Sequence, residues 1–158
     1  MNTGDKFEIR NLTKGKLPRL PFSRAKEMIL GKNYELSLVF IGNQLAKKLN
    51  KTYRNKNSPA DVLSFALDKN LGEIFINLAK AKTNIKLVLL LIHGLLHLKG
   101  GRHSSKMESE QRKFLSLIFP YVPSSIKRYR HRQLSDESND HRNGERFSTA
   151  THYRRRRG

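Results

Sequence analysis

Three of the six histidines in this 158-residue sequence lie within one short stretch, at positions 93, 97 and 103. Residues that are four apart share one face of a helix, so the imidazoles of His93 and His97 can point at the same ion. His103 follows Gly100 and Gly101, and glycine commonly ends a helix and lets the chain turn back. This spacing predicts three protein ligands of one metal ion, with a fourth position for water, as in catalytic zinc sites.

The alternative for each histidine is a hydrogen-bonded core residue, which is the common role of a single buried histidine. That interpretation is weaker for three histidines at this spacing. Because the sequence has no Cys, a structural zinc site with four protein ligands is not favoured. We expect one Zn²⁺ per chain and no small-molecule cofactor, although three imidazoles also suit other divalent metals such as nickel, copper or iron.

A peptidase is a second alternative, since the metzincin metallopeptidases space their three histidines in the same way. In those enzymes a Glu directly after the first histidine is the general base. Here that position is Gly94. Without the carboxylate, peptide hydrolysis at this site lacks its usual proton-transfer group, so a metzincin-like metallopeptidase is disfavoured.

One known family resembles this chain in its histidine stretch, which reads His93-Gly94-x-Leu96-His97-Leu98-x-Gly100-x-x-His103. It is the YbeY family of single-domain bacterial metal-dependent endoribonucleases that mature ribosomal RNA. Other stretches are similar to motifs of that family and occur in its order. They are Leu49-Asn50-Lys51-Thr52-Tyr53-Arg54, Pro59-Ala60-Asp61-Val62-Leu63-Ser64-Phe65 and Leu71-Gly72-Glu73-Ile74. The resemblance extends from about Phe7 to Phe119.

The resemblance implies a single-strand-specific, zinc-dependent endoribonuclease that acts in small-subunit rRNA 3′-end maturation and ribosome biogenesis in the cytoplasm. Its partners would be rRNA and the small ribosomal subunit. His93, His97 and His103 would hold the metal, which lowers the pKa of bound water for attack on phosphorus or for deprotonation of the RNA 2′-hydroxyl. Arg54 would be catalytic, because a guanidinium grips a phosphate by two hydrogen bonds and stabilises its growing charge.

The remaining alternative is a non-catalytic ribosome assembly factor, in which the metal stabilises the fold and basic surfaces bind RNA. From composition alone, Arg54 would be one more surface cation. Two features depart from the family pattern. Gly101-Arg102 stand where the family usually has Tyr-Asp, so a partner that orients a ligand is lost if that Asp has this role. The segment between Ile76 and His93 also looks shorter than usual.

Two further polar residues lie in the matching stretches. Ser64 is expected to be a strand hydroxyl rather than a nucleophile, because no Gly-x-Ser-x-Gly elbow surrounds it. Glu73 is either a solvated strand residue or a carboxylate near the metal. The sequence leaves these two roles of Glu73 open.

The composition indicates a polyanionic partner. Lys and Arg number 32 against 13 Asp and Glu, a formal net charge of +19, which favours RNA or DNA, or otherwise an acidic membrane surface. The absence of Cys suits a reducing cytosol. The N-terminus has no apolar signal region, and the longest apolar run, Ile85 to Leu98, is too short to cross a bilayer. No association with a membrane is expected.

We expect an α+β fold, with a small mixed β-sheet covered by helices and the histidine helix buried at its centre. Strands are expected over 7–12, 34–41, 61–67 and 71–77, and the last two should form a hairpin. Helices are expected from Pro21 or Phe22 to Leu30, over 43–49, over 78–99 with a break near Thr83-Asn84, and over 107–119. Lys51 to Pro59 should be a loop. Asn43, Asn84 and Ser104 or Ser105 are the expected N-caps.

The sequence predicts a domain over residues 1–123 and a basic tail over 124–158. The tail holds ten Lys and Arg, four Asp and Glu and few large apolar residues, so it cannot offset the entropy of ordering and should be disordered alone. Its last cations follow Tyr153, which can stack on a base. The predicted substrate-binding residues there are Arg154, Arg155, Arg156 and Arg157, and the alternative is a solubilising tail.

Overall fold

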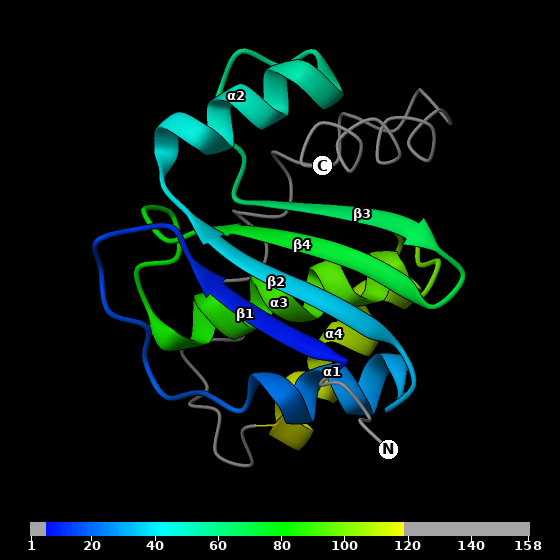
Figure 1. Cartoon of the computed structure of the whole chain (residues 1–158). Coiled ribbons are helices and arrows are strands. Elements are labelled where there is room, and N and C mark those ends of the chain that lie inside the picture. The colour runs from blue at the N-terminus through cyan, green and yellow to red at the C-terminus, as the bar shows by residue number, and fades with distance from the viewer. Residues whose placement is uncertain (1–5, 119–158) are drawn as a thin grey trace.

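The chain builds a β-sheet with helices on both faces, as seen in a computed structural model that describes residues 6–118 (Figure 1). The strands are β1 (Phe7–Asn11), β2 (Glu35–Ile41), β3 (Val62–Asp68) and β4 (Leu71–Asn77). The helices are α1 (Phe22–Leu30), α2 (Asn43–Arg54), α3 (Asn84–Leu98) and α4 (Ser105–Ile118). The predicted boundary near residue 123, the tail and its four arginines lie outside the described residues.

The sheet is mixed, as predicted, with the strand order β1-β2-β4-β3. β2 pairs in parallel with both β1 and β4, whereas β3 and β4 form the expected antiparallel hairpin. The turn at Lys69 and Asn70 carries small or polar residues suited to a tight reversal. β3 is therefore an edge strand of this sheet, and one of its long sides is not paired with another described strand.

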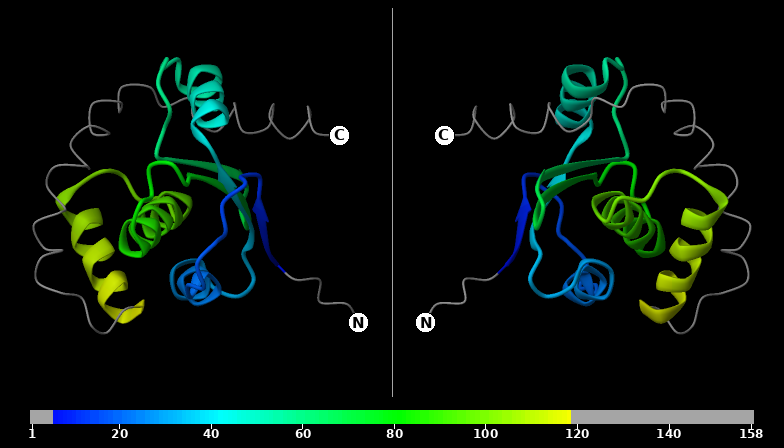
Figure 2. Two further views of the ribbon diagram at one scale, coloured as in Figure 1. Left: turned by 90° about the vertical axis from the view of Figure 1, so that its left-hand side faces the viewer. Right: turned by 90° about the vertical axis from the view of Figure 1, so that its right-hand side faces the viewer.

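The two faces of the sheet bury different cores, because successive side chains of a strand point in opposite directions. On β4, Ile74 and Ile76 join the core formed with α1, α3 and α4. Phe75 points the other way, into a smaller core that includes Leu49 of α2. Figure 2 shows the same division, with α2 on one side of the strands and the other three helices on the opposite side.

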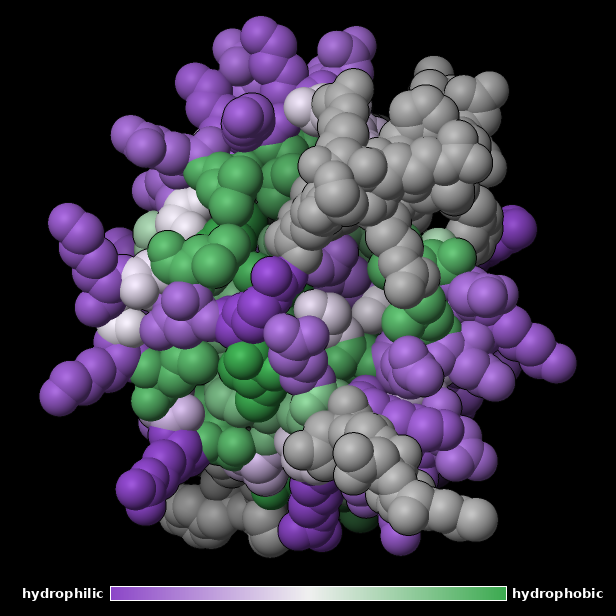
Figure 3. Space-filling model, viewed as in Figure 1, coloured by the Kyte–Doolittle hydropathy of each residue, from purple (hydrophilic) through white to green (hydrophobic). Residues whose placement is uncertain are grey.

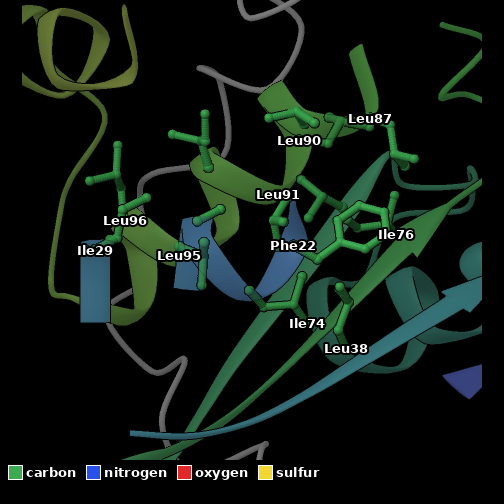
Figure 4. Close-up of a cluster of buried hydrophobic side chains, with 14 of the residues drawn as sticks. Phe22, Ile29, Leu38, Ile74, Ile76, Leu87, Leu90, Leu91, Leu95 and Leu96 are labelled. Atoms are coloured by element: carbon green, nitrogen blue, oxygen red, sulfur yellow. The ribbon is translucent and has the colours of Figure 1, made fainter. Parts of the chain in front are cut away.

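α3 is the central, buried helix that the sequence predicts. Leucines cover nearly all of its sides, and Leu91 and Leu95 are fully buried. Figure 4 shows these side chains in one cluster with Phe22 of α1 and Ile74 of the sheet. Burying one leucine side chain stabilises the folded state by roughly 2 kcal/mol. The buried leucines of α3 therefore fix the position of this helix and of the other side chains that it carries.

The start of α3 differs slightly from the prediction. Thr83 is the N-cap, and its hydroxyl accepts a 3.1 Å hydrogen bond from the backbone N–H of Lys86. Asn84 is the first helical residue rather than the cap, and residues 78–83 are not helical. Within the same turn the Lys86 ammonium lies 3.4 Å from an Asp61 carboxylate oxygen, so this buried cation is paired.

α2 continues beyond the predicted end at Leu49, through residues that were expected to form a loop. It ends at Arg54 because Asn55 adopts a left-handed conformation with φ 56°, which asparagine tolerates better than most residues. Tyr53 lies one turn after Leu49 and packs against the same core. This tertiary contact extends the helix through a polar sequence.

α4 begins at Ser105, two residues before the predicted start. Ser104, one of the two predicted caps, accepts a 3.2 Å hydrogen bond from the Met107 N–H through its hydroxyl. The buried face of α4 contains Leu115 and Ile118, whereas Leu117 is 45% exposed. Four residues of α4 are buried, and one of them, Gln111, is polar. No helix of the described residues has the length and apolarity that a membrane span requires.

Candidate metal centre

The end of α3 brings the third histidine back toward the first two. Gly100 has φ 103°, a left-handed conformation that glycine adopts without strain. Its N–H donates to the His97 carbonyl at 3.0 Å, and the Gly101 N–H donates to the Leu96 carbonyl at 2.8 Å. This pair of hydrogen bonds is the Schellman arrangement that ends helices. The chain reverses there, as the glycine pair predicts, and places His103 beside His97.

The three imidazoles converge. Their ligand nitrogens all lie within 4.8 Å of one another, and the Nε2 atoms of His93 and His97 are 3.0 Å apart. Nitrogens on a tetrahedral zinc at 2.0–2.1 Å are about 3.3 Å apart, so small side-chain movements suffice to place three of them around one ion. His93 is buried, while His97 and His103 are partly exposed. The cluster can therefore hold a metal ion that solvent reaches from one side.

A backbone carbonyl orients His97. The Nδ1 atom of this ring lies 3.1 Å from the Gly101 oxygen. Since a carbonyl only accepts, Nδ1 carries the proton and Nε2 presents its lone pair toward the cluster. The family's usual Asp is absent at Gly101-Arg102. His97 nevertheless has a hydrogen-bond partner, because the main-chain carbonyl of Gly101 takes that role.

Gly94 lies against the sheet at the position that holds the peptidase base in metzincins. A Cβ atom there would be 2.9 Å from the Ser64 hydroxyl and 3.1 Å from methyl groups of Ile74. A glutamate side chain has no space in this contact. The Ser64 hydroxyl donates a 3.2 Å hydrogen bond to the Gly94 carbonyl, which agrees with a structural rather than a nucleophilic role.

Glu73 is neither solvated nor part of the histidine cluster, the two roles that the sequence left open. It is 4% exposed and lies on the opposite face of β4 from Ile74. An Arg10 guanidinium nitrogen of β1 is 3.6 Å from its carboxylate. The group of potential metal ligands within residues 6–118 contains the three histidines and no carboxylate.

Arg54 is the last residue of α2 and is partly buried. The preceding ring, Tyr53, packs edge-on against Phe65 of β3 at a centroid distance of 5.2 Å. Because Ser64 contacts α3 and Phe65 contacts Tyr53, the edge strand β3 runs between the end of α2 and the histidine helix. The structure thus brings the three histidines together, while α2, which ends at Arg54, packs on the opposite face of the sheet from α3.

One known family matches most of this chain. The sequence model of the family described as "Endoribonuclease YbeY" matches residues 5–117. The chain belongs to the YbeY family.

Several members of the family are similar over much of their length. The "Endoribonuclease YbeY" of Ehrlichia ruminantium (strain Gardel) is 37% identical over 139 residues, which cover 74% of this chain and 84% of the relative. The protein of the same name from Pelagibacter ubique is 33% identical over 68% of this chain and 82% of the relative. That from Limosilactobacillus reuteri (strain DSM 20016) is 34% identical over 55% and 72%. The resemblance expected from the motifs is confirmed.

A solved structure has the same fold. It is the solution structure of TM1509 from Thermotoga maritima, with a TM-score of 0.53 and 22% identity over 89% of this chain and 99% of that chain. At this identity the likeness concerns the fold alone. It agrees with the α+β architecture predicted from the sequence.

Sequence reasoning missed one polar residue of this YbeY site, Gln111. Its amide nitrogen lies 2.6 Å from His93 Nδ1. The available signal was its position in the inward stripe of α4, between Met107 and Leu115 at helical spacing. A polar residue in an apolar stripe needs a partner inside the protein, and only the packing of α4 on α3 identifies that partner.

Proposed function

We propose that this chain is a zinc-dependent endoribonuclease that cleaves single-stranded RNA during ribosomal RNA processing. The observation that carries the proposal is the convergence of three imidazoles in a member of a family named for endoribonuclease activity. Three neutral nitrogen donors without a carboxylate or a thiolate suit zinc, and they leave one coordination position for reaction. The RNA substrate agrees with the net charge of +19.

The chain's own residues have distinct roles in this proposal. His93 and His97 hold the metal through Nε2, and His103 completes the set from the loop after α3. A bound zinc ion acts as a Lewis acid and lowers the pKa of coordinated water. Because His97 and His103 are partly exposed, a phosphodiester can approach from their side. The scheme needs no carboxylate base, which agrees with the closed contact at Gly94.

Arg54 is the proposed phosphate-binding catalytic residue. RNA that crosses the outer edge of β3 can reach the end of α2 on one face of the sheet and the histidines on the other. Exposed lysines continue the positive charge along α2 at positions 47, 48 and 51, and α2 contains no acidic residue. Figure 3 shows hydrophilic residues over α2 at the top of the molecule. This surface supports binding of a phosphate backbone.

The physiological target in this proposal is the 3′ end of the small-subunit rRNA, on the small ribosomal subunit in the cytoplasm. Residues 1–123 form the catalytic domain, and the basic residues 124–158 add affinity for RNA. Arg154 to Arg157 give that segment its highest density of positive charge, and four adjacent guanidinium groups suit a run of phosphates.

Replacement of His97 tests the proposal. We expect His97→Ala to reduce zinc, measured by elemental analysis, from about one ion per chain to near zero, and to abolish cleavage of a single-stranded RNA. Lys99→Ala, which removes an exposed charge from the same helix end, should retain both. Full zinc content in His97→Ala would refute the ligand assignment, and persistent cleavage without zinc would point to a contaminating nuclease. A zinc-replete wild type that binds RNA without cutting it would favour the assembly-factor alternative.

A further inference from the structure

The contact between Gln111 and His93 joins two buried polar side chains from different helices. Gln111 lies on α4 and is 2% exposed, and His93 lies on α3 and is 4% exposed. The separation of 2.6 Å between the amide nitrogen and Nδ1 is that of a short hydrogen bond. A buried amide without a hydrogen bond costs about 1–3 kcal/mol. Gln111 is therefore positioned by this ring, and this ring by Gln111.

The oxygen and the NH₂ group of a glutamine amide are nearly the same in size and shape, so the amide can take either of two orientations. In one orientation the NH₂ group donates to Nδ1 of His93, so the ring proton must be on Nε2. In the other orientation the oxygen accepts from Nδ1–H, and Nε2 has a free lone pair. The two differ by a half-turn of the amide and are assigned from the surrounding hydrogen bonds. The neighbourhood of His93 must therefore decide which orientation applies.

The first orientation gives a continuous chain of hydrogen bonds. Gln111 donates to His93 Nδ1, His93 Nε2–H donates across 3.0 Å to His97 Nε2, and His97 Nδ1–H donates to the Gly101 carbonyl. Every polar atom in this chain is satisfied, but the lone pair of His97 is occupied by His93. The arrangement is a pair of histidines bonded to each other.

The second orientation turns both lone pairs inward. The oxygen of Gln111 then accepts from His93 Nδ1–H, while the Gly101 carbonyl accepts from His97 Nδ1–H. Both Nε2 atoms present free lone pairs at the point where they lie 3.0 Å apart. A metal ligand of this kind generally donates its other ring N–H to an acceptor in the protein, which fixes the tautomer and raises the basicity of the ligand.

We propose that Gln111 is a positioning residue that sets the tautomer of His93 through its amide oxygen and so makes the ring a metal ligand. This inference rests on the proposed metal role of the three histidines. His93 becomes a ligand only when the amide oxygen of Gln111 faces its Nδ1 atom. The orientation of this side chain on α4 therefore determines whether His93 on α3 can bind the metal. The Gly101 carbonyl fulfils the same function for His97.

Substitutions at Gln111 test whether His93 needs a hydrogen-bond acceptor or a donor from this side chain. Gln111→Glu keeps an oxygen acceptor and removes the donor, whereas Gln111→Leu removes both with little change in volume. We expect zinc affinity, measured by competition with a chromophoric chelator at pH 8, to fall about 10- to 100-fold in the leucine variant. The glutamate variant should match or exceed the wild type. Gln44→Leu, the same change at an exposed site on α2, should leave affinity unaltered.

A spectroscopic measurement tests the tautomer without a variant. In zinc-loaded wild type, long-range ¹H–¹⁵N correlation spectra should show a protonated Nδ1 and an unprotonated Nε2 for His93. A protonated Nε2 would overturn the proposal. If Gln111→Leu fails to give a native circular dichroism spectrum, Gln111→Met provides the same loss of acceptor with a more adaptable side chain.

The outcomes also distinguish this inference from the proposed function. Equal losses of zinc affinity in the glutamate and leucine variants would mean that the donor matters, and unchanged affinity in both would mean that Gln111 has no positioning role. In either case His97→Ala would still lose zinc if the ligand assignment is correct. A wild type without measurable zinc affinity would overturn both proposals.

Discussion

The backbone of Gly94 packs directly against Ser64, whose hydroxyl donates a 3.2 Å hydrogen bond to the Gly94 carbonyl. The helix that carries two of the proposed ligands thus approaches the β3–β4 hairpin as closely as its backbone allows. The same contact leaves no space for the carboxylate that peptidases with this histidine spacing require. Gly94 therefore allows the close packing of α3 on the hairpin and also keeps a carboxylate base out of this position.

Gly94→Ala should destabilise the protein. The added Cβ would be 2.9 Å from the Ser64 hydroxyl and 3.1 Å from two carbon atoms of Ile74, and overpacking of this kind costs about 1–3 kcal/mol. Urea unfolding of both proteins measures the difference. Gly15→Ala is the matched control, because its nearest neighbour would be 3.6 Å away. Equal stability of Gly94→Ala and wild type would show that the helix and the hairpin can separate without cost.

The part of the site that the sequence predicts is the part that depends on local geometry. The helical spacing of His93 and His97 and the left-handed Gly100 lie within a few residues of one another, so local rules suffice. Gln111 was missed because its contact with His93 spans two helices. Its partner follows from how α4 packs on α3, which no local pattern encodes.

The location of Arg54 could not be predicted for a similar reason. Which face of the sheet α2 covers depends on the strand order β1-β2-β4-β3, since a strand that pairs elsewhere would move the helix after it. The helix itself was predicted to end at Leu49 because the following residues are polar. The contact of Tyr53 with Phe65 is a tertiary interaction that overrides this weak local preference.

Tyr34→Phe should stabilise the protein, and more so at high pH. The Tyr34 hydroxyl is buried and has no hydrogen-bond partner among the described residues, so its removal should contribute about 1 kcal/mol at pH 7. Burial also raises the pKa of Tyr34 from 10.0 to about 12. Between these values the unfolded chain loses the proton and the folded protein retains it, so the wild type loses stability as the pH rises above 10.

Urea unfolding at pH 7 and pH 11 tests this expectation. Every other titrating group is common to the two proteins, so the change in their stability difference isolates Tyr34. The difference should widen at pH 11 in favour of the phenylalanine variant. A constant difference would mean that the hydroxyl ionises as readily in the folded state as in the unfolded chain.

Arg54→Ala should reduce cleavage without affecting the metal. If the guanidinium stabilises charge on the phosphate, its loss should lower the single-turnover rate by about 100-fold or more, while zinc content stays at the wild-type level. Arg54→Lys should recover little of the rate, because an ammonium cannot form the two parallel hydrogen bonds. Lys32→Ala removes one exposed charge from the loop after α1 and is the control. Similar rates for Arg54→Ala and Lys32→Ala would exclude a specific phosphate role.

Removal of residues 124–158 should weaken RNA binding and reduce its dependence on salt. Each phosphate contacted by a cation contributes about −0.7 to the slope of log affinity against log salt for single-stranded nucleic acid. If Arg154 to Arg157 contact four phosphates, their replacement by glutamine in the full chain should reduce the slope by about 3. The melting temperature should change little, because the segment has few large apolar residues. An unchanged slope would show that these four cations make no phosphate contact.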